Sequence, residues 1–262
     1  MFGAQTDIFC DISPVTGGDI MLKEIIKTSK NIVFFGGAGV STESNIPDFR
    51  SESGLYTAQT VYGHPPEYLL SYTCFKSEPE LFFQYYKENL IHINAKPNAA
   101  HIALADMEQA GQLSAVITQN IDGLHQAAGS KNVIELHGSN SRQLCKNCGA
   151  IYGLDFIMNS SNCDGFIPKC AKCGGMVRPD VVLYEEQLDD NVVGSAVKAI
   201  SGADCLIVGG TSLVVYPAAG LLRYFRGSRL VLINKGETDY DNRADLVIRD
   251  SIGKVLAEAV EE

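Results

Sequence analysis

The sequence contains no apolar run long enough to cross a membrane, which takes roughly 20 consecutive apolar residues. It also has no dense run of lysine or arginine, and its net charge is −10, so we expect no nucleic-acid partner. The first twelve residues include Asp7 and Asp11 but no basic cluster, so we expect no secretory signal there. We find no internal repeat and no low-complexity tract. These absences favour a cytoplasmic protein that makes no membrane contact.

The composition that is present is that of an ordinary globular protein, with 45% hydrophobic and 20% charged residues. The 262 residues suffice for one large α/β domain with a smaller insertion, or for two modest domains. Eight cysteines without an export signal favour metal ligation in a reducing compartment over a disulfide framework. The acidic charge suits a basic partner such as a lysine-rich peptide, although it equally serves solubility.

A glycine-rich turn after a short apolar run is the most informative stretch. Residues 32–35 predict a buried strand, and Gly36, Gly37 and Gly39 then allow the backbone to turn sharply and approach a ligand closely. Residues 40–44 can open a short helix whose N-terminus favours a diphosphate. A strand, a glycine-rich turn and a helix start together form the phosphate-binding half of a dinucleotide site. Alone this pattern is a weak signal, because many α/β proteins contain a glycine-rich turn.

The continuation of this stretch argues against an ordinary dehydrogenase. That fingerprint requires a small residue where Thr42 stands, and an acid roughly 20 residues further on at the end of a second strand. Pro47 disfavours helical geometry at Ile46, so the helix is interrupted at once. The Asp-Phe-Arg triplet at 48–50 then suggests a lid over a cofactor.

The remaining pattern alternates strands with helices. Because the strands are nearly all apolar, we expect a parallel sheet covered on both faces. The aromatic residues within 82–86 are expected to pack a helix against its neighbours. Predicted strands are 32–35, 114–118, 133–136, 181–184, 204–209, 230–234 and 246–249; predicted helices are 20–29, 66–70, 79–93, 98–111, 192–201, 218–225 and 252–261.

Two Cys-x-x-Cys pairs give the most specific motif. Cys145 and Cys148 are followed by Cys170 and Cys173, a spacing typical of four-thiolate structural zinc. The 21-residue gap lies just beyond the usual ~15–20 residues. A redox dithiol is the alternative, but such pairs occur singly. Four protein ligands fill the tetrahedron, so the metal should stabilise the fold and take no part in chemistry.

Polar residues follow several predicted strands, at the carboxyl edge where α/β proteins bind ligands. Gln119, Asn120 and Asp122 crowd one turn, although Asp122 alone would also suit helix capping. His137 follows another strand and precedes Gly138; imidazole is a natural general base near neutral pH, although a lone histidine is more often a packing or surface residue. The small-residue loop 209–219 and the end of strand 230–234 belong to the same edge.

Together these motifs resemble the sirtuin family of NAD-dependent protein-lysine deacylases, from residue 19 onward. The resemblance implies an α/β fold with a Rossmann-like parallel sheet covered by helices on both faces and an inserted small zinc-ribbon and helical domain. The NAD-binding domain would comprise 19–60, 95–140 and 179–262; the small domain would comprise the helical insertion 61–94 and the zinc module 141–178; residues 1–18 would form an N-terminal arm. The motifs are Gly-Ala-Gly-Val-Ser at 37–41, Ile-Pro-Asp-Phe-Arg at 46–50, Thr-Gln-Asn-Ile-Asp at 118–122, His-Gly at 137–138, the cysteine pairs, Gly-Thr-Ser at 210–212 and Ile-Asn at 233–234.

The resemblance also implies a site. His137 and Asn120 would be catalytic, and the four cysteines would bind one structural Zn²⁺. A set of residues would bind NAD⁺ at its diphosphate and ribose, at its nicotinamide and at its adenosine. These residues are Gly37, Ala38, Gly39, Thr42, Ile46, Asp48, Phe49, Arg50, Gln119, Asn120, Ile121, Asp122, His137, Gly210, Thr211, Ser212, Asn234, Lys235 and Ile252.

The implied reaction removes acetyl or another neutral acyl group from a lysine of a protein or peptide. His137 would take a proton from a ribose hydroxyl, and the products would be free lysine, nicotinamide and O-acyl-ADP-ribose. A monomer is expected. The alternatives are a protein ADP-ribosyltransferase or NAD glycohydrolase on the same fold, and a non-catalytic NAD-binding or zinc-ribbon interaction module.

Several positions depart from the family pattern. Gly36 stands where threonine is usual, and Asn45 replaces a glycine; asparagine is among the few residues that accept a left-handed backbone. Leu-Tyr-Glu-Glu at 183–186 replaces the common Phe-Gly-Glu run beside the peptide. Residues 85–89 lack the arginine of succinyl-specific members, so an acidic acyl chain would lack a bidentate partner.

Overall fold

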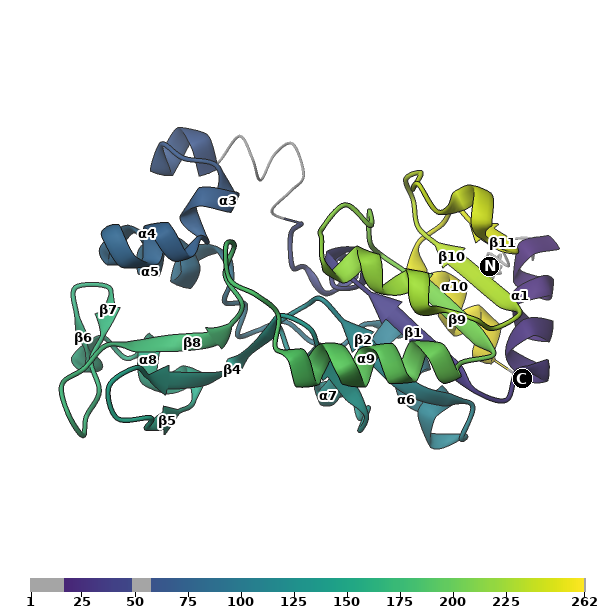
Figure 1. Cartoon of the computed structure of the whole chain (residues 1–262), viewed down its shortest axis with the longest axis horizontal. Coiled ribbons are helices and arrows are strands. Elements are labelled where there is room, and N and C mark those ends of the chain that lie inside the picture. The colour runs from purple at the N-terminus through teal and green to yellow at the C-terminus, as the bar shows by residue number, and fades with distance from the viewer. Residues whose placement is uncertain (1–16, 49–57, 262) are drawn as a thin grey trace, which may run out of the picture.

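The computed structural model describes residues 17–48 and 58–261, and a six-stranded parallel sheet organises the larger part of it (Figure 1). The chain order along the sheet reverses between β1 and β9, which both pair with their neighbours in parallel. In such sheets the ligand crevice lies at the carboxyl ends of the strands beside this reversal. The order is β11 (Leu246–Ile248), β10 (Arg229–Ile233), β9 (Cys205–Gly209), β1 (Ile32–Gly36), β2 (Leu113–Thr118) and β3 (Val133–Glu135).

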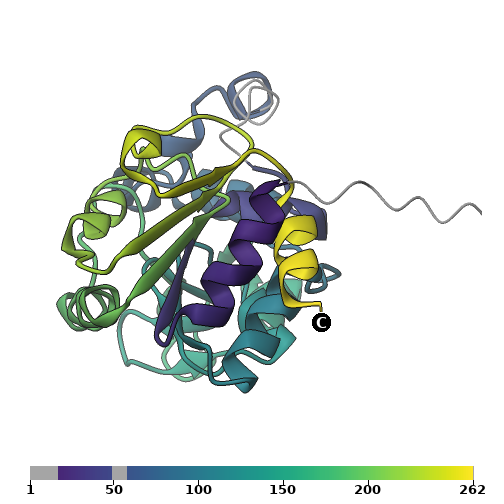
Figure 2. The same cartoon turned by 90° about the vertical axis from the view of Figure 1, so that its right-hand side faces the viewer.

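Helices cover both faces of this sheet, as Figure 2 shows in end view. Strand side chains alternate between the faces, so Phe34 packs on one side and Phe35 on the other, both fully buried. The predicted Rossmann-like parallel sheet is therefore confirmed. One face is covered by α1 (Gly17–Thr28), α6 (Ala99–Gln109) and α10 (Ile252–Val260), and the other by α9 (Asp190–Gly202) and η4 (Ala218–Tyr224).

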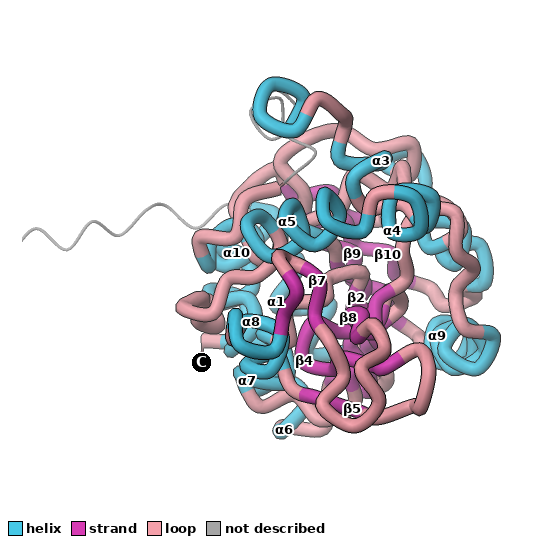
Figure 3. The backbone as a smooth tube through the Cα atoms, turned by 90° about the vertical axis from the view of Figure 1, so that its left-hand side faces the viewer, coloured by secondary structure: helices cyan, strands magenta, loops and turns pink. Residues whose placement is uncertain are grey.

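A second, smaller part is built on an antiparallel sheet and helices, seen end-on in Figure 3. Phe82, Phe83 and Tyr86 of α5 are fully buried in its core, and Phe75 lies edge-on to Phe82 with ring centroids 5.2 Å apart. The aromatic residues of this helix therefore pack as predicted. Its elements are the sheet β5 (Ile151–Tyr152), β4 (Gly138–Cys145) and β8 (Val177–Val181), the hairpin β6 (Cys163–Asp164) and β7 (Ile167–Pro168), and the helices α3 (Pro66–Leu69), α4 (Tyr72–Ser77), α5 (Pro79–Asn89) and α8 (Leu154–Met158).

Short elements complete the connections. They are η1 (Ala38–Val40) and η2 (Thr42–Ser44) after β1, α7 (Leu124–Ala128) after β2, η3 (Ser160–Asn162) and η5 (Asp241–Arg243). Among the described residues, no helix is both long and apolar enough to cross a membrane.

The structure corrects the prediction of a parallel strand at 181–184. Strand β8 ends at Val181 and pairs antiparallel with β4, and Tyr184 forms only an isolated bridge with Ser71. Pro179 is accommodated because β8 lies at the edge of its sheet, where a missing N–H costs no ladder hydrogen bond. Two helix predictions also differ in detail: α5 ends at Asn89, and η4 is a 3-10 helix.

Candidate active site

Two cavities meet above the carboxyl ends of β1, β2 and β9. The smaller, about 260 Å³, and the larger, about 450 Å³, both contact Ala38 and Gln119. The smaller cavity is also lined by Gly37, Gly39, Asp48, Gly210, Thr211, Ser212 and Asn234, all predicted from the sequence. The larger is also lined by the predicted residues Ile46, Asn120, Ile121, Asp122 and His137. The predicted site residues on separate segments therefore gather around one cleft.

The glycines after β1 and β9 are required by close backbone contact. The N–H of Gly39 donates a 2.8 Å hydrogen bond to the carbonyl of Gly210. A Cβ on Gly39 would lie 2.8 Å from the Cα of Gly210, and Gly210 itself has φ of +58°. At Gly39 and Gly210 no side chain covers the backbone, so a diphosphate can approach it closely there.

Asn45 ends η2 in the left-handed conformation, with φ of 61°. The expectation that asparagine serves here in place of glycine is confirmed. Beside it, the side-chain amide of Asn98 donates to the carbonyl of Val40 and to the hydroxyl of Ser44, at 2.8 and 3.0 Å. These contacts fix the loop that follows the glycines against the start of α6.

Ser41, Asn120 and Asp122 form a hydrogen-bonded group on the wall of the larger cavity. The Ser41 hydroxyl donates to Oδ2 of Asp122 at 2.7 Å and accepts from Nδ2 of Asn120 at 3.0 Å. The other oxygen of Asp122 accepts from the N–H of Leu124, the first residue of α7, at 2.9 Å, which forms an Asx-type turn before the N-cap Gly123. Asp122 therefore both supports the start of this helix and lines the cavity.

His137 is held at two points where the chain passes from β3 to β4. Its Nδ1 lies 2.9 Å from the carbonyl oxygen of Gln119, and its own carbonyl accepts from the N–H of Val182 at 2.9 Å. A carbonyl can only accept, so Nδ1 bears the hydrogen and the neutral ring keeps Nε2 as its basic nitrogen. His137 is half-buried and lines the larger cavity. This arrangement suits a general base.

The larger cavity is bounded on its far side by residues of the second part. The hydroxyl of Tyr86 donates to Oδ1 of Asn140 at 2.7 Å, and both residues line the cavity. None of the described lining residues is an arginine or a lysine. A carboxylate-bearing acyl chain would therefore find no arginine or lysine among these described residues.

Arg178 and Glu186 fix the segment that departs from the family pattern. Arg178 is buried and makes two hydrogen bonds to the Glu186 carboxylate, at 2.7 and 2.9 Å. Partial burial raises the pKa of Glu186, but hydrogen bonds from Arg178 and from the N–H of Leu183 outweigh it, and the net shift is downward. Glu186 therefore stays ionised and anchors the loop beside the cavity.

The four predicted zinc ligands converge at the opposite end of β4. Their Sγ atoms all lie within 4.8 Å of one another, with Cys145–Cys173 at 3.5 Å and Cys148–Cys170 at 3.6 Å. Four thiolates about 2.3 Å from a tetrahedral zinc would be about 3.8 Å apart, so the residues fit the metal. Cys145 ends the strand that begins after His137, which places the cluster roughly 20 Å from the cleft by strand rise.

A sequence model of the Sir2 family matches residues 37–217. The chain belongs to the Sir2 family. It is 63% identical over 235 residues to an NAD-dependent protein deacetylase of Clostridium acetobutylicum, covering 90% of this chain and 95% of the relative. It is 62% identical to the protein of the same description from Clostridium perfringens, covering 92% and 97%.

Solved Sir2 structures share this fold. A Sir2 homolog–NAD complex superposes with a TM-score of 0.81 at 39% identity, covering 92% of each chain. A structure of Sir2 bound to acetylated peptide gives a TM-score of 0.79 at 36% identity, covering 90% of this chain and 94% of that one. The sirtuin resemblance of the sequence is thus confirmed.

Not every predicted residue of this Sir2 protein lies at the cleft. Thr42 and Lys235 are exposed, and neither lines a cavity. Ile252 is buried; a Cβ on Gly209 would lie 2.2 Å from its Cδ1, so these two residues pack together. Phe49 and Arg50 lie outside the described residues. Their assigned roles stay predictions.

Two groups at this Sir2 site were not predicted. Gly236 and Glu237 line the smaller cavity, and their place just after a strand end was the available signal. His101 and His125 are fully buried behind the site with ring centroids 4.7 Å apart. Within the described residues, neither ring nitrogen of His125 has a hydrogen-bond partner. Burial lowers the pKa of both, and with His101 beside it the pKa of His125 falls to about 3.

This histidine pair predicts acid sensitivity of the fold. The pKa of His125 is lower in the folded state than the ~6.5 of an unfolded chain, so the unfolded state binds more protons as pH falls from 6.5 toward 3. Stability present above pH 6.5 is thus lost through that window, by up to about 1.4 kcal/mol per pH unit for this group. Urea unfolding at pH 7.5, 6.5 and 5.5 should show this slope.

The matched variants are His125→Leu, which removes the titrating group, and His64→Gln, at a histidine that is not fully buried. We expect His125→Leu to flatten the dependence of unfolding free energy on pH, and His64→Gln to retain it. Equal slopes for His125→Leu and the unmodified protein would contradict the prediction.

Proposed function

We propose that this Sir2-family protein is an NAD-dependent protein-lysine deacetylase that releases nicotinamide and O-acyl-ADP-ribose. The observation that supports this most is the place of His137: it lines the larger cavity and hydrogen-bonds Gln119, one of the two residues shared by both cavities. A base at that junction can act where a dinucleotide in one cavity meets a peptide lysine in the other. The names of relatives at up to 63% identity agree.

Each cavity suits one part of the substrates. The backbone of Gly37 and Gly39 would receive the diphosphate, and Thr211, Ser212 and Asn234 would contact the adenosine side. The amide of Asn120 and the carboxylate of Asp122 can pair with the carboxamide of nicotinamide. We retain the predicted contacts of Thr42, Phe49, Arg50, Lys235 and Ile252 as part of the proposal.

The chemistry divides between the dinucleotide and the chain. When bound, NAD would supply a ribose carbon that becomes electrophilic as nicotinamide departs. The acyl oxygen of the substrate lysine can attack this carbon. His137 Nε2 accepts the proton of a ribose hydroxyl, while Gln119 holds Nδ1–H and keeps the ring in that tautomer. The deprotonated ribose oxygen then attacks the acyl carbon, and one water molecule is consumed as the bond between the acyl carbon and the lysine nitrogen breaks, so that lysine leaves as the free amine and the acyl group remains on ADP-ribose.

The proposal includes the predicted organisation of the chain. Residues 19–60, 95–140 and 179–262 form the NAD-binding domain, and 61–94 with 141–178 form the small domain, whose cysteines hold zinc as a structural cross-link. We also propose that the protein is a monomer in the cytoplasm without a nucleic-acid partner. The net charge of −10 argues against binding of nucleic acid. The four-thiolate cluster is typical of a reducing compartment.

The test is incubation with NAD and an acetyl-lysine peptide, with products weighed by mass spectrometry. We expect free lysine, nicotinamide and O-acetyl-ADP-ribose in equal amounts. A succinyl-lysine version of the same peptide should react at least about tenfold more slowly, because no described cation lines the larger cavity to pair its carboxylate.

Other outcomes would overturn the proposal. ADP-ribose label retained on protein, with the peptide still acetylated, would indicate an ADP-ribosyltransferase. Nicotinamide release with free ADP-ribose alone would indicate an NAD glycohydrolase. If no NAD were consumed, the result would indicate a non-catalytic binding module. Equal cleavage of both peptides would refute the assigned acyl preference.

A further inference from the structure

The chain passes from the parallel sheet to the antiparallel sheet across only two residues, and His137 is one of them. Glu135 ends β3 and Gly138 begins β4. Gly138 has φ of +76°, and a Cβ there would lie 2.1 Å from the carbonyl oxygen of Asp180. The crossing is therefore pressed against β8, and the orientation of β8 relative to β3 determines where His137 lies.

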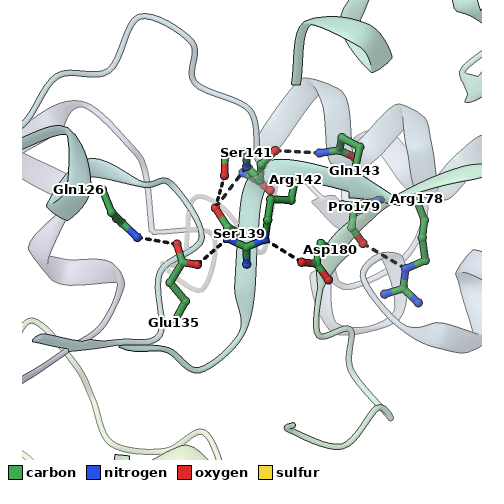
Figure 4. Close-up of polar contacts among 10 residues, drawn as sticks. Gln126, Glu135, Ser139, Ser141, Arg142, Gln143, Arg178, Pro179 and Asp180 are labelled. Carbon is green, nitrogen blue, oxygen red and sulfur yellow. Dashed lines mark hydrogen bonds and ion pairs between the residues drawn. The ribbon is translucent and has the colours of Figure 1, made fainter. Parts of the chain in front are cut away.

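One guanidinium joins the β3 end of this crossing to β8, as Figure 4 shows. Nη1 of Arg142 lies 3.0 Å from Oε2 of Glu135, and its Nε lies 2.8 Å from Oδ2 of Asp180. The second oxygen of Glu135 accepts from Nε2 of Gln126 at 2.8 Å. Arg142 thus connects the last residue of β3 with β8, while Gln126 of α7 holds Glu135 in place.

A bulge in β4 makes this contact possible. Ser139 pairs with Asp180 and Gln143 pairs with Pro179, so residues 140–142 have no partners opposite on β8. Bulges of this kind redirect side chains and are common beside active sites. Within the same bulge, the N–H of Asn140 donates to the carbonyl of Ile121 at 2.8 Å, which ties the bulge to the cavity wall.

We propose that Arg142 is a positioning residue for His137, an inference that rests on the proposed function. The side chains of Arg142 and Asp180 are 45% and 39% exposed, and only Glu135 is mostly buried, at 12%. Ion pairs that include an exposed guanidinium add little to global stability. Arg142 instead makes two hydrogen bonds, one to each carboxylate, that fix the separation of Glu135 and Asp180. Without it, β8 can shift relative to β3. The two anchors of the His137 residue, Gln119 and Val182, then move relative to each other.

The two steps of the proposed reaction provide the test. Exchange of labelled nicotinamide into NAD in the presence of acetyl peptide needs nicotinamide departure but not the proton transfer by His137, whereas formation of free lysine needs both. We expect Arg142→Gln to lower kcat for deacetylation about tenfold, since a misplacement of ~1 Å can cost up to ~10²-fold. KM for peptide and NAD should stay within twofold, and exchange should be retained.

Further variants separate positioning from stability. Arg142→Lys supplies the charge without the fork and should recover only part of kcat. Glu135→Gln should reduce kcat similarly, and the double variant with Arg142→Gln should be no worse than either single one. Arg229→Gln, at the amino end of β10, is the matched control and should leave kcat unchanged. Melting temperatures of the Arg142 variants should stay within about 3 °C of the unmodified protein.

The inference would be overturned if the unmodified protein were active and Arg142→Gln left the ratio of the deacetylation rate to the exchange rate unchanged. This would hold even if Arg142→Gln lowered both rates by the same factor. An unmodified protein that shows neither exchange nor deacetylation would refute the proposed function, and this inference with it.

Discussion

His137→Ala is expected to lower kcat for deacetylation by about 10²–10⁴-fold, the range typical for loss of a general base. The ring nitrogen that would accept the ribose proton is gone, while the walls that contact the substrates are unchanged. Nicotinamide exchange should persist, because departure of nicotinamide precedes the proton transfer. The measurement is parallel quantification of free lysine and of exchanged nicotinamide by mass spectrometry.

His64→Ala provides the control, because His64 lies outside both cavities. It should keep both activities. Full deacetylation by His137→Ala would show that another group takes the proton, and loss of exchange to the same extent as deacetylation would show that His137 acts earlier, on binding or on nicotinamide departure.

Cys145→Ala is expected to abolish zinc binding and to unfold the antiparallel sheet. Apparent binding free energies of structural zinc are about 10–16 kcal/mol in small peptides, as large as the whole stability of a typical domain. Purified protein should contain one zinc per chain, and the variant close to none. Hydrogen exchange should lose protection in β4, β5 and β8, and deacetylation should fail because β4 begins directly after His137.

Cys163→Ala is the matched control within the same region. Its Sγ is not part of the four-thiolate cluster and contacts Lys87 at 3.3 Å instead. Zinc content and exchange protection should therefore be unchanged. A Cys145→Ala protein that retains both zinc and protection would contradict a structural role for this cluster.

The parallel sheet could be predicted from sequence because its central strands β1 and β9 are apolar runs buried on both faces. Residues 32–35 and 205–209 show this pattern, and both form strands beside the reversal of chain order. The cysteine pairs were equally specific, since few other arrangements use two Cys-x-x-Cys motifs. The strand-end positions of Asn120 and His137 placed them at the cleft correctly.

The second sheet could not be predicted in the same way. Strand β4 contains Gly, Ser, Asn, Arg and Gln, with no alternation of apolar residues, and its conformation depends on pairing with β5 and β8. Strand β8 contains Pro179, which a strand accommodates at a sheet edge, and the sequence alone does not show that β8 lies at an edge. Burial of His101 and His125 depends on how α6 packs against α7, a tertiary contact that the sequence does not encode locally.

The two cavities share two walls, Ala38 and Gln119, and otherwise have separate linings. Under the proposed assignment of substrates, a small inhibitor confined to the smaller cavity would displace the dinucleotide while leaving the larger cavity accessible. A fragment in the larger cavity would instead block the acylated peptide. Joining two such fragments past Ala38 would convert the second binding event into an intramolecular one, so modest affinities would combine into a strong one. Selectivity could then be built into the half that faces Tyr86 and Asn140.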